Sequence, residues 1–168
     1  MGFIIRHRQS MRPITISFGG SEREQLQIGI VGYERQPVGD VYDDNWLNVR
    51  ITVSAGGFRG EVAATFLTGE FVSFLSQLRP LHESLRGRAE FRTMEEQLRL
   101  RLDGDGLGHI ELKGELLDRA GIGNRLTFTL QVDQTQLGKT ILELEKATSE
   151  FPVRLPNKSG SANCRPLP

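Results

Sequence analysis

The sequence has one cysteine, few aromatic residues, no net charge and no long apolar run, and each of these excludes a class of protein. The single Cys164 cannot form a disulfide within the chain or a zinc cluster. No stretch reaches the roughly 18 apolar residues that a membrane-spanning helix needs. The sequence therefore predicts a soluble cytoplasmic protein that binds no metal, cofactor or membrane.

The charges balance overall but are unevenly distributed. Residues 36–151 hold 13 basic and 18 acidic side chains, whereas both ends of the chain are basic. An acidic central region disfavours binding to nucleic acid, which requires positive charge against the phosphates. A solvated surface is the simpler explanation of this acidity, and steering of a basic protein partner is the functional one.

The length and the hydrophobic pattern predict one domain. We expect a disordered leader at 1–11, a single domain at 12–151 and a disordered, proline-containing tail at 152–168. Apolar and polar residues alternate in eight short stretches, which is typical of half-buried antiparallel strands. These stretches cover residues 14–18, 26–30, 47–53, 62–66, 89–91, 98–102, 110–116 and 126–132.

A helical period interrupts the strands at residues 71–85. Thr68 is the candidate N-cap of this helix, and Gly87 is the candidate left-handed residue after its end. Pro80 lies inside the segment, where a proline removes a hydrogen bond, so we expect it to kink or split the helix.

A second helical period covers residues 137–151, with Asp133 or Thr135 as its N-cap. Each predicted helix has one apolar stripe, and the predicted strands have one apolar face. The simplest packing is an α+β fold, in which two amphipathic helices lie on one face of a curved antiparallel sheet of about 7–8 strands.

The sequence has no Gly-x-Ser-x-Gly, His-Glu-x-x-His, Walker or Gly-x-Gly-x-x-Gly motif in a catalytic context. Its histidines, His7, His82 and His109, have no acidic or cysteine companions at ligand spacing. The acidic segment starting at Asp103 resembles a calcium loop, but Gly114 stands where a bidentate Glu is required. A tight turn explains that segment better, and the sequence predicts no enzyme.

The only tryptophan, Trp46, shares its strand face with polar residues. Either another segment covers it, or it anchors a protein partner, because tryptophan is enriched in binding hot spots. Candidate partner-binding residues surround it and also occupy a hairpin tip. They are Asp40, Asp43, Asp44, Asn45 and Trp46 in the first patch, and Asp103 and Asp105 in the second.

Six segments, in order along the chain, resemble the WapI family of bacterial immunity proteins. They are residues 45–49, 53–60, 71–87, 103–109, 121–126 and 133–135, and the resemblance spans residues 26–153. Pro80 and Gly138 depart from the family pattern. The resemblance carries over no catalytic residue.

The resemblance implies a cytosolic protein that neutralises the C-terminal, tRNA-nuclease-like domain of a contact-dependent bacterial toxin by binding it. A nuclease presents a basic cleft, so an acidic patch on the inhibitor speeds association and fixes its orientation. The residues alone leave two other functions open. One is a small-ligand-binding α+β domain, and the other is a homo-oligomer with a structural role.

Overall fold

The computed structural model describes residues 13–156, so the expected leader at 1–11 and residues 157–168 of the expected tail lie outside the described part. Within it, eight strands and two helices follow one another, with a short 3-10 turn, η1, before the third strand. Their bounds are β1 (Ile14–Ser21), β2 (Glu24–Tyr33), η1 (Asp43–Asn45), β3 (Trp46–Ala55), β4 (Phe58–Leu67), α1 (Thr68–Ser84), β5 (Arg86–Arg92), β6 (Leu98–Asp105), β7 (His109–Leu117), β8 (Arg125–Asp133) and α2 (Gln134–Glu150).

The expected α+β fold of antiparallel strands and two helices is confirmed, and the strands divide into two sheets. One sheet has the order β1-β2-β3-β4 and the other β5-β6-β7-β8, with every neighbouring pair antiparallel. The division falls at α1, whose 17 residues extend for about 25 Å. Because this helix separates β4 from β5, a hairpin cannot join the two sheets.

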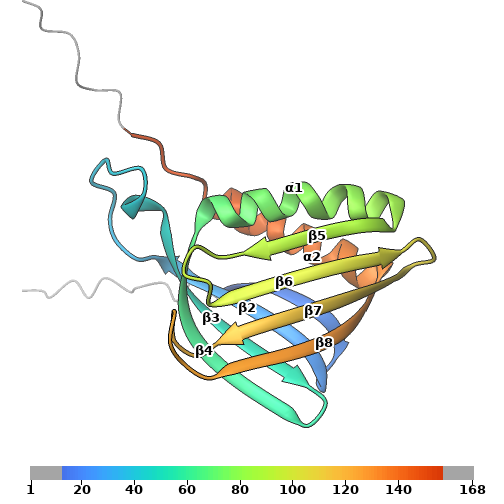
Figure 1. The fold of residues 1–168 in the computed structure, drawn as a ribbon. Helices are drawn as coiled ribbons and strands as arrows, with labels where there is room; N and C mark the ends of the chain where they lie inside the picture. Colours follow the sequence, from blue (N-terminus) through green and yellow to red (C-terminus); the bar gives the residue numbers. More distant parts are fainter. Residues whose placement is uncertain (1–12, 157–168) are drawn as a thin grey trace, which may run out of the picture.

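The inner faces of both sheets enclose one apolar core (Figure 1). The helices close the side of the molecule along β1 and β5, with α2 against β1, α1 against β5 and the two helices in contact. Phe66 of β4, Phe71 and Phe74 of α1, and Phe91 of β5 form an aromatic cluster with ring centroids 5.1 to 6.0 Å apart. This cluster joins both sheets to α1.

Helix α1 begins one residue earlier than expected and is not split by its proline. Leu67 is its N-cap, and the Glu70 carboxylate accepts the Leu67 amide at 3.0 Å. Thr68 does not cap the helix, because its hydroxyl donates to Asn45 instead. Pro80 lies on the exposed face, where water can satisfy the carbonyl that has lost its amide partner.

The other helix ends follow from local chemistry. Asp133 caps α2 as expected: its carboxylate accepts the Gln136 amide at 2.8 Å, and the Gln136 side chain accepts the Asp133 amide. After α1 the left-handed residue is Leu85, with φ of 56°, although Gly87 was expected to take that place. Neither helix of the described residues is long and apolar enough to cross a membrane.

Helix side chains cover the outer edges of β1 and β5. Glu143 of α2 accepts the Ser17 backbone amide at 2.7 Å, and the Thr140 hydroxyl donates to the Ser17 carbonyl. On the other sheet, the Gln77 side chain of α1 accepts the Glu90 amide at 3.0 Å. Backbone groups that an edge strand otherwise leaves unpaired are therefore satisfied within the fold at these positions.

Candidate functional site

A long connection between β2 and β3, residues 34–45, carries most of the first predicted patch. Neighbouring antiparallel strands are usually joined by about two to five residues, so this loop is longer than the topology requires. It projects beside the N-terminal end of α1, and residues 151–156 pass next to it (Figure 1). Long ordered loops of this kind frequently carry function.

Asp44 holds one half of this loop in place. It is buried, and its carboxylate accepts the backbone amides of Val38 at 2.9 Å and Gly39 at 2.7 Å, and Nε of Arg35 at 3.1 Å. Burial acts to raise the pKa of the Asp44 carboxyl, but the two amides and the guanidinium together bring that pKa below its ordinary value. Asp44 is therefore ionised and internally satisfied.

Asn45 ties the loop to two other parts of the chain. It is buried, and its Oδ1 accepts the Thr68 hydroxyl at 3.1 Å and the Arg154 amide at 2.7 Å. Its Nδ2 donates to the carbonyls of Val41 and Arg154. Through these bonds Asn45 holds Arg154, a residue of the predicted tail, against the loop.

Arg154 completes this contact. Its guanidinium lies over the Tyr33 ring, 3.3 Å from the centroid, and Nη1 donates to the carbonyls of Arg35 at 3.0 Å and Asp44 at 3.2 Å. The Tyr33 hydroxyl donates to the Pro152 carbonyl. Sequence reasoning placed Arg154 in the tail, and no sequence pattern pairs it with a loop more than a hundred residues earlier.

Three residues of the first patch reach the surface. Asp40 and Asp43 are exposed, and Trp46 is half-buried on the outward side of β3. Asp40 Oδ1 accepts the backbone amides of Tyr42 and Asp43 at 2.9 Å, just before η1. The Asp43 carboxylate pairs with Arg35 at 3.2 Å. The patch thus consists of two buried residues that hold the loop, Asp44 and Asn45, and three residues available to a partner.

The acids of the second patch have partners within the same hairpin region. Asp103 accepts from Nε of both Arg88 and Arg101 at 2.7 Å. Asp105 accepts backbone amides of the turn, and its other oxygen lies 3.2 Å from the His109 ring. These contacts agree with the turn interpretation of this acidic segment.

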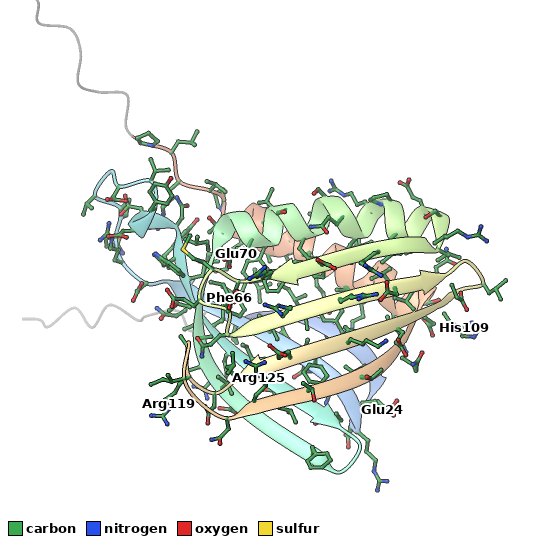
Figure 2. The ribbon with its side chains drawn as sticks, viewed as in Figure 1. Glu24, Phe66, Glu70, His109, Arg119 and Arg125 are labelled. Carbon is green, nitrogen blue, oxygen red and sulfur yellow. The ribbon has the colours of Figure 1, made fainter. Side chains whose placement is uncertain are left out.

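The structure does not bring the two patches together. Figure 2 shows His109, next to the second patch, at one end of the sheets, whereas the 34–45 loop lies at the opposite end beyond Glu70. The two predicted patches are therefore separate surfaces and do not form one site.

Hollows occur on the outer faces of both sheets and between α1 and β5. A groove of about 510 Å³ crosses the outer face of β6, β7 and β8 between Arg99, Arg101, Lys113 and Thr129. The inner faces of the sheets are occupied by the apolar core. Within residues 13–156, no group of three or more histidine, cysteine or acidic side chains is placed to hold a metal ion.

Comparison with known proteins identifies a family but no characterised relative. No curated protein matches the chain. A chain of a guide-RNA-binding protein complex bound to its guide RNA is 12% identical, with 89% of this chain and 100% of that chain covered and a TM-score of 0.48. The siderocalin Ex-FABP, described as having dual ligand specificities, is 9% identical, with 93% and 94% covered and a TM-score of 0.24.

Neither of these structural similarities assigns a function. The model of the immunity protein WapI-like family, in contrast, matches residues 17–152. This range contains α1, α2 and every strand except the first residues of β1. The match agrees with the family resemblance of the sequence, and the chain belongs to the immunity protein WapI-like family.

Proposed function

We propose that the chain protects its cell by binding and neutralising the C-terminal domain of a bacterial contact-dependent toxin in the cytoplasm. The observation that carries this proposal is the family match over residues 17–152. We infer a tRNA-nuclease-like toxin domain with a basic cleft as the partner, and inhibition by coverage of that cleft without chemistry on the part of this chain.

The 34–45 loop supports this function better than the hairpin tip does. Asp40 is exposed, and its carboxylate accepts the backbone amides of Tyr42 and Asp43. No side-chain cation within residues 13–156 pairs with it, so its charge is free to meet a partner. Asp103 at the tip, in contrast, is paired with two arginines. A basic partner can pair with Asp40 without displacing an existing ion pair, whereas at Asp103 it would have to displace an arginine.

Co-expression tests the proposal. The toxin domain encoded beside the chain's own gene is induced in a sensitive host, with and without the full chain. We expect growth arrest from the domain alone, and growth together with a co-purifying complex when the chain is present. Persistent arrest in cells that hold the folded chain at matched levels would contradict the proposal.

A second measurement separates inhibition by binding from chemical inactivation. The toxin domain is released from the complex with denaturant, refolded alone and assayed on tRNA. Inhibition by binding predicts full recovery of nuclease activity and an unchanged mass by mass spectrometry. A toxin domain with a changed mass that stays inactive, while the same domain denatured and refolded without the chain recovers, would show that the chain acts as an enzyme.

A further inference from the structure

Exposed apolar side chains gather on two short segments that are far apart in the sequence. Five of the twelve large apolar side chains that are exposed in the described part of the chain belong to them. They are Val38, Val41 and Tyr42 in the 34–45 loop, and Val153 and Leu155 after α2. We call the segment after α2 the strap, and these five residues the loop–strap platform. Tyr42 and Leu155 are 71% and 79% exposed, and it is the clustering of exposed apolar side chains that sets this region apart from scattered ones.

The two segments are adjacent in space. A single nitrogen, Nδ2 of Asn45, donates to the carbonyls of both Val41 and Arg154. These bonds place the backbone of Val41 next to that of Arg154. Figure 1 shows the segment after α2 passing the loop at this point.

The backbone beneath the platform is held by buried polar residues. Asp44 fixes the amides of Val38 and Gly39, and Asn45 fixes the end of η1 against α1 and Arg154. A surface that is already ordered loses less conformational entropy on binding than a flexible loop does. Exposed apolar side chains on such a backbone are typical of a preorganised protein-binding surface.

The charge around the platform indicates the chemistry of its partner. The two segments carry four carboxylates and two guanidinium groups. The carboxylates are those of Glu34, Asp40, Asp43 and Asp44, and the guanidinium groups are those of Arg35 and Arg154. Both guanidinium groups are engaged: Arg35 by Asp43 and Asp44, and Arg154 by Tyr33 and backbone carbonyls. The complementary surface is therefore an apolar patch bordered by basic residues.

We propose that the loop–strap platform is the surface that docks the toxin domain, and that the segment after α2 contributes directly to the contact. This inference rests on the proposed function and assigns its binding surface. Tyr42 and Leu155 are the apolar anchors, one from each segment, and Asp40 and Asp43 meet the basic border of the partner.

The test is binding of the purified toxin domain to the full chain by calorimetry. The double variant Tyr42→Ala/Leu155→Ser should bind about 30-fold more weakly or worse, because each change removes an exposed anchor. Its thermal midpoint should match that of the wild type, since both side chains lie mostly in solvent. Leu107→Ser/Ile122→Ser is the matched control: these side chains are 81% and 73% exposed on other loops, and binding should change by less than about twofold.

The outcomes separate the two proposals. Wild-type binding with no loss in the Tyr42→Ala/Leu155→Ser variant would overturn the platform assignment and leave the proposed function standing. Absence of wild-type binding would overturn both. Self-association of the wild-type chain that the same variant abolishes, seen by sedimentation without toxin, would assign the platform to a second copy of the chain and also overturn the inference.

Discussion

Phe128 of β8 lies opposite Gly114 of β7, and its ring covers the glycine so closely that a Cβ on Gly114 would stand 2.1 Å from Phe128 Cζ. Both residues are buried. The missing side chain at 114 therefore makes room for the aromatic ring at 128, and the two positions depend on each other.

Gly114→Ala should lower the free energy of unfolding by about 1–3 kcal/mol, the range for overpacking a close-packed core. In a Phe128→Leu background the same change should do less harm, because the shorter side chain leaves space. Chemical denaturation of the four chains of this cycle measures the coupling. Gly69→Ala is the control, because a Cβ there meets nothing within 4 Å. If Gly114→Ala lowered the free energy of unfolding equally with Phe128 and with Leu at position 128, the interpretation would be wrong.

The Asp44 carboxyl should make the 34–45 loop sensitive to acid. Its pKa is below the ordinary value in the folded protein, so its contribution to stability is fully present above the unfolded value of about 3.9 and is lost as the pH falls through the lower folded value. Fluorescence of Trp46, which directly follows η1, reports on the loop during titration.

Asp44→Asn should remove this acid transition and loosen the loop at neutral pH, because an amide cannot accept as strongly from both backbone amides and Arg35. An Asp44→Asn chain with the same acid titration of Trp46 fluorescence as the wild type would show that another group is responsible.

Asn45→Ala should release the segment after α2. It removes the bonds to Thr68, Val41 and Arg154 and leaves buried polar groups unpaired, which costs about 1–3 kcal/mol per unsatisfied group. Limited proteolysis should then cut within 152–156 faster than in the wild type. Asn48→Ala, on the exposed side of β3, should leave the cleavage rate unchanged. Equal cleavage of the wild type and the Asn45→Ala variant would show that Asn45 does not hold the segment.

Association with the toxin domain should depend on the acids of the loop. Asp40→Asn/Asp43→Asn should slow association and reduce its dependence on ionic strength, with a smaller effect on dissociation. Stopped-flow mixing at several salt concentrations measures both rates. Glu24→Gln, which removes one negative charge at a hairpin away from the loop, is the control (Figure 2). An association rate that responds to Glu24 but not to the loop acids would exclude electrostatic steering by this patch.

Much of the fold was predictable because each strand has a clear period of two. The period of two predicted the outward position of Trp46. The local sequence predicted that Asp133 caps α2. The division into two sheets did not follow, because alternation places a strand in a half-covered sheet without naming its partners. Strand pairing stops between β4 and β5 because α1 lies between them in the chain and packs against β5.

The roles of the individual site residues were harder to predict from the sequence than the fold was. Asp44 and Asn45 were predicted as surface contacts, since acidic and amide residues in a loop are usually exposed. They are buried because Val38, Gly39, Thr68 and Arg154 supply their partners. Such partners lie in three separate segments, so only the tertiary structure distinguishes a residue that supports the loop from one that contacts a partner.

The bonds from Glu143 and Thr140 to Ser17, and from Gln77 to Glu90, have a consequence for behaviour at high concentration. At these positions the backbone cannot template a strand from a neighbouring molecule until a helix moves away. Loss of these side chains would therefore appear first as intermolecular aggregation or exchange of strands between copies, while each copy still folds correctly when dilute.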